Sequence, residues 1–186
     1  MMRRILVSVC LLAFSFALAA CAPSYSAYYA SDSNVPYRLA SGDRLRVIVY
    51  GQEGLSNSYS VDGSGHIQMP LISLVAAQGE TTASLGQEIE RRLRDGFLRD
   101  PHVSVEVEAF RPFFILGEVT TPGQYPYVNG MTAETAVAIA GGFTPRANKD
   151  AVDVTREVDG KQLTGQAPIR YSVQPGDTIV VRERFF

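Results

Sequence analysis

Apolar residues recur at every second position in two stretches of the chain, a pattern typical of β-strands, and the second stretch has the apolar and polar alternation of a half-buried strand. Leu45, Val47 and Val49 occupy alternate positions in the first stretch, and over residues 103–107 three valines alternate with a serine and a glutamate. Further short strands are expected over residues 113–119, 152–156 and 178–181. The pattern therefore predicts a protein rich in short strands.

Two clusters of turn residues predict hairpins between such strands. The first, Asp62-Gly63-Ser64-Gly65, separates residues 59–61 from residues 66–69, and the second is Asp159-Gly160-Lys161. Because aspartate and glycine tolerate positive φ, both clusters can reverse the chain tightly. We expect a hairpin at each of them.

A first helix is predicted in the middle of the chain. Thr81 or Thr82 supplies a suitable N-cap, and the helix should end near Gly96. Its apolar residues recur at helical spacing and form one stripe: Leu85, Ile89 and Leu93. The glutamates and arginines between them predict a solvated opposite face that carries charge pairs four residues apart.

A second helix is predicted from Thr132 to Gly141 and Gly142. Its inward positions are small residues at i, i+3, i+4 and i+7, namely Ala133, Ala136, Val137 and Ala140. A small-residue face permits a close approach to a sheet. Together with the strands, the two helices predict an α+β fold built from small mixed sheets that are each packed by a helix.

Composition narrows the class of protein. The 186 residues are 46% hydrophobic and include 16 Gly and 10 Pro, which is typical of a globular chain with many turns. The formal net charge of -2 argues against a nucleic-acid partner, because phosphate binding needs a surplus of Lys and Arg. Cys10 and Cys21 are the only cysteines, so no disulfide or cysteine-based metal site is expected after residue 21.

The first twenty residues have the pattern of a signal peptide. Arg3 and Arg4 precede the uncharged run Ile5–Ala20, which is shorter than the roughly 20 residues that a membrane-spanning helix needs. The sequence Leu18-Ala19-Ala20-Cys21 then resembles the lipobox of bacterial lipoproteins, which implies acylation of Cys21. The alternative is an ordinary cleavable signal in which Cys21 is incidental. We expect a signal peptide over residues 1–20 and lipidation at Cys21.

Residues 21–35 are rich in Ser and Ala and lack apolar periodicity, so they are interpreted as a lipidated N-terminus and linker. Tyr25, Tyr28 and Tyr29 leave two alternatives to solvent exposure: a place at the lipid headgroups or packing on the folded body. Ala22 resembles the residue that sorts lipoproteins to the outer membrane. The expected localisation is therefore the periplasmic face of the outer membrane, held by a lipid anchor.

The sequence offers few candidates for catalysis. It contains no P-loop, dinucleotide fingerprint, zinc-protease motif or nucleophile elbow. His66 and His102 lack partners at metal-ligand spacing. Glu106, Glu108 and Glu118 could supply the acid and base of a glycosidase, but a solvated strand face explains them more simply. We expect no enzyme activity, no catalytic residue, no metal and no cofactor.

A loose internal echo links the two ends of the folded region. Tyr37 and Leu39 precede Gly42-Asp43, and Tyr171 and Val173 precede Gly176-Asp177 at the same spacing. Each Gly-Asp pair can turn the chain into a strand, so the echo is interpreted as a repeated turn. Nothing in the spacing brings the two aspartates together as a catalytic pair.

Several motifs resemble a known family in their order and spacing. Residues 37–47, 61–67, 69–72 and 100–105 resemble the polysaccharide export domain of the bacterial outer-membrane polysaccharide export family. The motifs Gly117-Glu118-Val119-Thr120-Thr121-Pro122-Gly123-Gln124-Tyr125, Gly130-Met131-Thr132 and Ala140-Gly141-Gly142-Phe143-Thr144 resemble its soluble-ligand-binding β-grasp (SLBB) module. The resemblance implies an export domain over residues 36–110 and a β-grasp domain over residues 111–186.

The resemblance also implies a function. Members of this family form an oligomeric ring of lipoproteins through which exopolysaccharide or capsule polymer leaves the cell, and they dock on an inner-membrane polysaccharide copolymerase. The matched Gly and Pro residues suit turns and identify no contact with polymer. We expect passive transport by a short family member that hands polymer to a separate outer-membrane β-barrel, because no segment of the sequence can span the bilayer.

The sequence allows alternatives for its last two residues, for its function and for the strength of sugar binding. Phe185 and Phe186 suit either a docking tail or a terminal strand packed in its own core. The protein could instead be a periplasmic adaptor that regulates polysaccharide synthesis, or an enzyme that modifies glycans through Glu106 or Glu108. The sequence contains no Trp, so tight capture of one sugar unit is less expected than weak contact.

Overall fold

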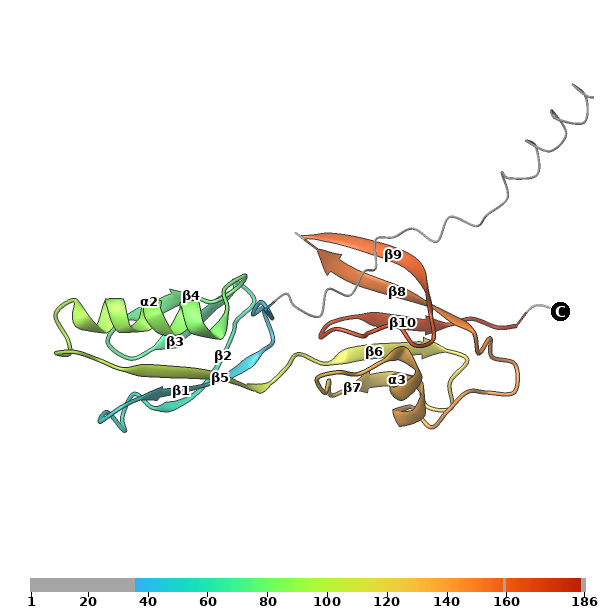
Figure 1. The fold of residues 1–186 in the computed structure, drawn as a ribbon, viewed down its shortest axis with the longest axis horizontal. Helices are drawn as coiled ribbons and strands as arrows, with labels where there is room; N and C mark the ends of the chain where they lie inside the picture. The colour runs from blue at the N-terminus through green and yellow to red at the C-terminus, as the bar shows by residue number, and fades with distance from the viewer. Residues whose placement is uncertain (1–35, 159, 185–186) are drawn as a thin grey trace, which may run out of the picture. The chain divides into compact units, whose positions relative to one another are not determined.

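The computed structural model describes residues 36–158 and 160–184. Within them the chain forms ten strands and two helices, which confirms the predicted α+β class (Figure 1). We call β1 to β5 with α2 the N-terminal module, and β6 to β10 with α3 the C-terminal module. The expectations for Cys21, for residues 1–35 as a whole, and for Phe185 and Phe186 lie outside the described residues.

The N-terminal module contains a three-stranded antiparallel sheet in the order β2-β1-β5. Its strands are β1 (Arg44–Val49), β2 (Asn57–Ser60) and β5 (Val103–Ala109). In β1 the alternation predicted from the sequence is present, because Leu45, Val47 and Val49 are all buried. The same side chains belong to the core of this module, so the period of two in the sequence sets which face of the sheet turns inward.

A separate two-stranded hairpin covers another part of this core. It consists of β3 (His66–Met69) and β4 (Ser73–Ala76). The predicted hairpin between residues 59–61 and 66–69 is therefore wrong in its pairing, since β2 pairs with β1 and β3 pairs with β4. The turn itself is present: the Asp62 side chain accepts the backbone N–H groups of Ser64 and His66. The backbone N–H of Val61, just before the turn, donates to the backbone oxygen of Asp43 beside β1. The turn therefore connects the three-stranded sheet to the hairpin of β3 and β4.

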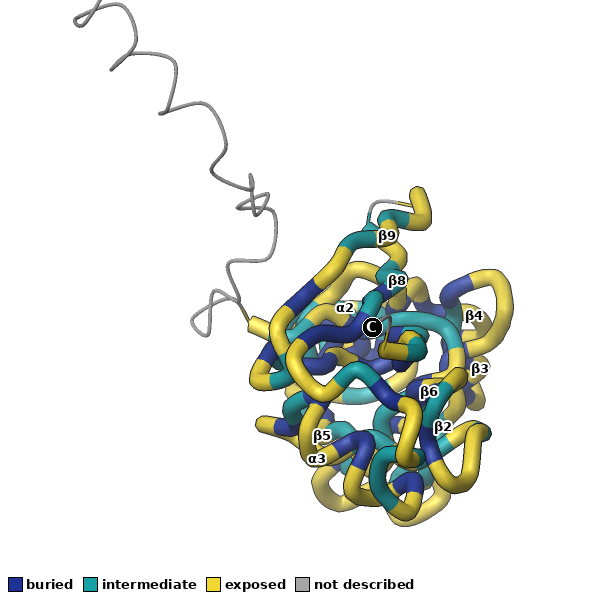
Figure 2. The backbone as a smooth tube through the Cα atoms, turned by 90° about the vertical axis from the view of Figure 1, so that its right-hand side faces the viewer, coloured by how far each residue is buried: buried dark blue, intermediate teal, exposed yellow. Residues whose placement is uncertain are grey.

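Helix α2 (Thr82–Arg94) begins and ends where the sequence predicts. Thr81 caps it and accepts the Ser84 N–H, while the Ser84 hydroxyl accepts the Thr81 N–H, which together form a capping box. The predicted stripe of Leu85, Ile89 and Leu93 is fully buried. Each such side chain contributes about 1.5–3 kcal/mol, so packing stabilises this helix more than its cap does. Figure 2 colours the backbone by burial and shows buried and exposed segments in close succession along the chain.

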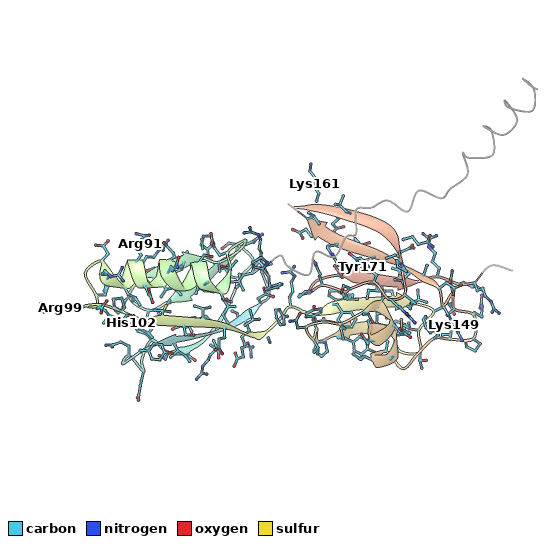
Figure 3. All side chains as sticks on the ribbon, in the orientation of Figure 1. Arg91, Arg99, His102, Lys149, Lys161 and Tyr171 are labelled. Carbon is cyan, nitrogen blue, oxygen red and sulfur yellow. The ribbon has the colours of Figure 1, made fainter. Side chains whose placement is uncertain are left out.

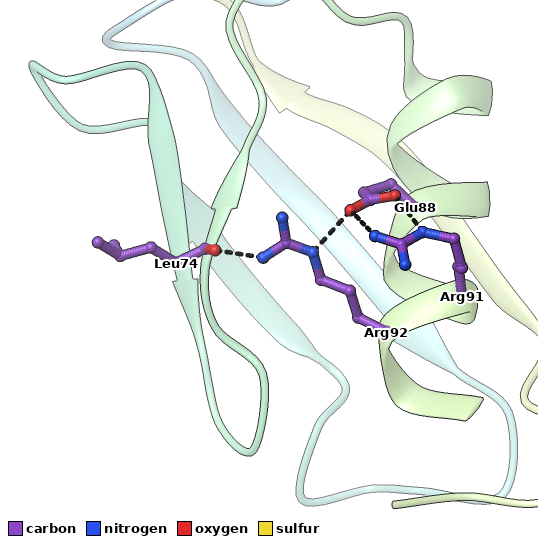
Figure 4. A network of polar contacts seen from close by, with 4 residues as sticks. All are labelled: Leu74, Glu88, Arg91 and Arg92. Atoms are coloured by element: carbon purple, nitrogen blue, oxygen red, sulfur yellow. Dashed lines mark hydrogen bonds and ion pairs between the residues drawn. The ribbon is translucent and has the colours of Figure 1, made fainter. Parts of the chain in front are cut away.

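The polar face of α2 carries a network centred on Glu88 (Figure 4). Its carboxylate accepts hydrogen bonds from Arg91 at 2.7 Å and from Arg92 at 2.6 Å. Arg92 also donates to the backbone oxygen of Leu74, which links the helix to strand β4. These two arginines lower the pKa of Glu88 to about 2.

The C-terminal module is built on a five-stranded mixed sheet in the order β7-β6-β10-β8-β9. Its strands are β6 (Phe113–Gly117), β7 (Gly123–Tyr125), β8 (Ala151–Val158), β9 (Lys161–Pro168) and β10 (Thr178–Val181). Strands β8 and β9 pair from Ala151 with Pro168 to Val158 with Lys161, which confirms the second predicted hairpin. Strand β10 lies in the centre of the sheet and runs parallel to β6.

Helix α3 (Ala133–Ile139) begins after the capping residue Thr132, as the sequence predicts. The predicted small-residue face is buried, since Ala133, Ala136 and Ala140 are wholly inaccessible. Small side chains let the helix backbone approach its neighbours closely, and backbone hydrogen bonds tie both of its ends to the surrounding chain. The helix lies beside β6 and β7 in Figure 1.

The two faces of the five-stranded sheet differ sharply in burial. On one face Phe113 and Ile115 of β6 and Ile179 of β10 are fully buried. The alternate residues of the same strands point the other way, where Phe114 is 41% exposed and Leu116 is 45% exposed. The second face is therefore uncovered by the described residues.

Candidate functional site

The two histidines occupy separate places and make different contacts. The Nδ1 atom of His66 lies 2.9 Å from the backbone oxygen of Ser64, so this ring stabilises the turn before β3. His102 projects from the chain just before β5, where its Nε2 lies 3.6 Å from a carboxylate oxygen of the exposed Asp100 (Figure 3). Sequence reasoning treats both as weak candidates for a metal or a general base. Among the described residues, neither histidine belongs to a group of three possible metal ligands.

The three candidate glutamates do not gather into one site. Glu106 and Glu108 are exposed on β5, and Glu106 lies opposite Arg46 on the outer face of the three-stranded sheet. Glu118 follows β6 in the other module, where it accepts a hydrogen bond from the Thr144 hydroxyl. Glu118 thus fastens the chain near α3, while the other two lie on a solvated strand face.

Among the described residues, no three side chains from His, Cys, Asp and Glu lie close enough together to hold a metal ion. The same part of the chain contains no helix that is both long enough and apolar enough to cross a bilayer.

The repeated Gly-Asp turns contain Asp43 and Asp177, the two charged residues that are buried within the described part of the chain. In the first, the fully buried carboxylate of Asp43 accepts hydrogen bonds from the Tyr37 hydroxyl at 2.7 Å and from the Ala40 N–H at 2.9 Å. Its other oxygen accepts the backbone N–H of Arg111 at 2.9 Å. A carboxylate with three donors is satisfied without water, so Asp43 holds the turn together.

The second turn repeats this arrangement around Asp177, which is also fully buried. Its carboxylate accepts the Gln174 N–H at 2.7 Å, at the same i-3 position that Ala40 holds in the first turn. Arg156 then clamps both carboxylate oxygens, with Nε at 2.8 Å and Nη2 at 2.7 Å. The guanidinium carbon of Arg156 lies 5.3 Å from the centre of the Tyr171 ring, which Figure 3 labels.

Both turns meet the same side chain, that of Arg111. A Cβ added to Gly42 would lie 3.3 Å from the Cβ of Arg111, and one added to Gly176 would lie 2.5 Å from its Nε. Both glycines have positive φ, at 94° and 85°. The glycines therefore provide both the left-handed turn and the space that Arg111 fills.

Aromatic rings surround this meeting point. Phe110 packs edge-on against Tyr37, with ring centres 5.0 Å apart, and against Tyr127 at 5.4 Å. Burial, and next the hydrogen bond to Asp43, raise the pKa of the Tyr37 hydroxyl well above its ordinary value of 10. Tyr37 therefore stays neutral and acts as a donor.

The interpretation of the echo as a repeated turn is thus confirmed, and the two aspartates are structural. Each has its own set of donors and is inaccessible to solvent. Sequence reasoning missed Arg111 and Arg156, because neither belongs to the repeated motif. The one available signal is that an arginine must pair with a buried carboxylate, and the sequence does not say which one.

Taken together, the described residues form two sheet-and-helix modules fastened by buried turns, a scaffold in which the polar groups stabilise the fold. Comparison with known proteins agrees with this class. A family model described as polysaccharide biosynthesis/export protein matches residues 31–108, and a model of the SLBB domain matches residues 112–165. Residues 31–108 therefore contain a domain of the polysaccharide export type, and an SLBB domain follows it over residues 112–165.

One relative supports the same assignment. The chain is 37% identical over 119 residues to the exopolysaccharide production protein ExoF of Rhizobium meliloti (strain 1021). The match covers 58% of this chain and 28% of that protein, so the chain spans little more than a quarter of its relative.

Proposed function

We propose that this protein is a lipid-anchored component of a conduit that exports exopolysaccharide or capsule polymer across the periplasm. It works as an oligomeric ring at the periplasmic face of the outer membrane. An inner-membrane copolymerase lies on one side and an outer-membrane partner on the other. Transport through it is passive, with the driving force supplied by polymer synthesis elsewhere, and the protein itself catalyses no reaction.

The observation that carries this proposal is the succession of an export domain and an SLBB domain in one chain. The local chemistry of the candidate residues supports it as well. The buried aspartates Asp43 and Asp177 are satisfied by donors from the fold, and Glu106 and Glu108 face solvent on a strand. These groups suit a scaffold that guides a polymer.

Deletion of the gene in the source bacterium tests the export role. Secreted polysaccharide should fall to background, while polymer synthesis in cell extracts persists. Normal secretion by the deletion strain would overturn the proposal. Loss of polymer synthesis in the extracts, with export restored when synthesis is bypassed, would instead identify a regulatory adaptor.

The lipid anchor is tested by a matched pair of cysteine substitutions. We expect Cys21→Ala to move the protein from the membrane fraction to the soluble periplasmic fraction and to reduce export, because an acylated cysteine holds a soluble body at a bilayer. Cys10→Ala lies inside the apolar signal run and should leave the membrane fraction unchanged. Equal fractionation of the two variants would refute lipidation at Cys21.

The ring is tested by the mass of the detergent-extracted full chain. A closed assembly of identical subunits needs one repeated head-to-tail interface, so we expect a single species whose mass is a whole multiple of the subunit mass. A monomer at all protein concentrations, alone and with the copolymerase, would contradict the ring.

A further inference from the structure

The uncovered face of the C-terminal sheet presents an ordered row of side chains. Strand pairing aligns one residue from each of the five strands in the order Gln124, Phe114, Thr178, Thr155 and Thr164. Residues directly opposite one another in a sheet share a face, so this row crosses the whole sheet. At about 4.8 Å between neighbouring strands, the row is about 19 Å long.

A second row runs beside the first. It contains Leu116, Val180, Asp153 and Gln166, which the pairing of β6, β10, β8 and β9 places next to one another. Asp153 is neutralised by an ion pair with Arg182. The face thus carries apolar side chains on β6 and β10 and mostly neutral polar side chains on the strands that flank them.

Several polar groups on this face have hydrogen-bonding capacity to spare. The hydroxyls of Thr155 and Thr164 lie 2.8 Å apart and bond to each other. Within the described residues, the side chains of Gln124, Thr178 and Gln166 make no hydrogen bond. Amides and hydroxyls both donate and accept, so this surface can bond to a ligand that is rich in hydroxyl groups.

The second row continues into a hollow at the edge of the sheet. Gln166, Arg182 and Asn148 line this hollow, together with the charged residues Lys149, Asp150, Glu183 and Arg184, and its volume is about 580 Å³. Ligand sites have volumes of roughly 300–1,000 Å³, and the volume of this hollow lies within that range. The hollow lies next to β9, the strand that carries Gln166, so the face is not flat at this edge of the sheet.

We propose that this face, defined by the two rows and the hollow, is where the protein contacts the polysaccharide that it exports, an inference that rests on the proposed function. A sugar ring has a C–H-rich face that packs on an aromatic ring, and Phe114 offers an exposed ring. The hydroxyl groups around a sugar ring match the neutral donors and acceptors of the threonines and glutamines. The geometry supplies both kinds of contact within the width of the sheet.

The chemistry of the face favours a glycan over a second copy of the chain. A stable protein interface buries about 800 Å² on each partner and has an apolar, closely packed centre. Here the apolar centre is limited to Phe114, Leu116 and Val180, and polar side chains border it on both sides. One phenylalanine in place of a broad aromatic plate also suits weak contact, which lets a polymer move on.

Affinity electrophoresis of the full chain in mild detergent tests this surface. The probe is the extracellular polysaccharide purified from the medium of the source bacterium and cast into the gel. We expect the polymer to retard the wild-type protein and Phe114→Ala to weaken that binding about threefold to tenfold, the loss of one ring contact. Val128→Ala is the matched control, because Val128 is 63% exposed in the same module but lies outside the face.

The absence of Trp from the sequence offers a second readout. Phe114→Trp keeps an aromatic ring at the site and introduces the only indole in the chain, so its fluorescence should shift when the polymer is added. Val128→Trp should show no shift, and dextran of similar mass controls for crowding. If the polymer also retards Phe114→Trp in the affinity gel, the weaker binding of Phe114→Ala is due to loss of the ring contact and not to a folding defect.

Each outcome decides the proposal. Equal retardation of wild type and Phe114→Ala, or no retardation of the wild type, would overturn it. A change in oligomer mass in Phe114→Ala with unchanged retardation would assign the face to a second copy. The gene deletion separates this failure from failure of the proposed function: if deletion blocks secretion while Phe114→Ala restores it fully and binds polymer normally, only the face is wrongly assigned.

Discussion

The Asp177→Asn substitution should destabilise the C-terminal module strongly. It keeps the shape of the side chain but removes the charge that compensates Arg156, whose side chain is 14% exposed. Two hydrogen bonds from this guanidinium end on the Asp177 carboxylate, which is wholly buried, and a third ends on the backbone oxygen of Ser172. Removing one partner of a buried ion pair costs about 3–5 kcal/mol, a large part of the 5–15 kcal/mol that stabilises an ordinary domain.

Urea unfolding of the full chain, followed by circular dichroism, measures this loss. The midpoint should fall with little change in slope, and the melting temperature should drop by about 6–20 °C. Asp62→Asn is the matched control, because Asp62 also accepts backbone N–H groups in a turn but is exposed. Its effect should be much smaller.

A double substitution separates loss of charge from loss of shape. Adding Arg156→Met to Asp177→Asn removes the uncompensated cation, so part of the stability should return. Two results would refute the reasoning: a loss below about 1 kcal/mol in Asp177→Asn, or a double variant as unstable as the sum of the single changes.

Three further predictions concern other parts of the fold. Gly117→Ala should destabilise far more than Gly130→Ala: both glycines have positive φ, but only at Gly117 would the new Cβ lie 2.1 Å from a backbone oxygen of β10, and thermal unfolding of the two variants measures the difference. Glu88→Gln should cost less than about 1 kcal/mol at neutral pH; because the folded pKa of Glu88 is lowered to about 2, its contribution is complete above about pH 4.5 and is lost as the pH falls toward 2, so wild type and variant should converge in acid. Tyr37→Phe should weaken the turn at Asp43; because the raised pKa of Tyr37 stabilises the neutral hydroxyl, this contribution is present below pH 10 and is lost at higher pH, and unequal loss of stability in alkali between wild type and variant would confirm it, whereas parallel curves would contradict it.

Local signals explain how much of the fold can be predicted from the sequence. The cap at Thr81 and the small-residue face of α3 depend on neighbours within one or two turns, and both predictions are confirmed. The pairing of β3 with β4 could not be predicted. The side chain of Asp62 satisfies the backbone of its own turn, so the turn gives no indication of which strand pairs with β3.

The candidate site shows the same limit. The echo of Gly42-Asp43 and Gly176-Asp177 is visible in the sequence, and its interpretation as a turn is correct. That both turns close on Arg111 is a long-range property, which spacing along the chain does not encode. The row through Phe114 was also missed, because it is assembled from five strands whose order the sequence leaves open.

The central position of β10 has a consequence for how the protein matures. This strand joins β6 to β8, so the two parts of the C-terminal sheet stay separate until residues 178–181 have been synthesised. Contacts between segments more than sixty residues apart form slowly. The N-terminal module, whose strands pair before residue 110, can fold first, while the edge of β6 that pairs with β10 stays open until this last neighbour arrives.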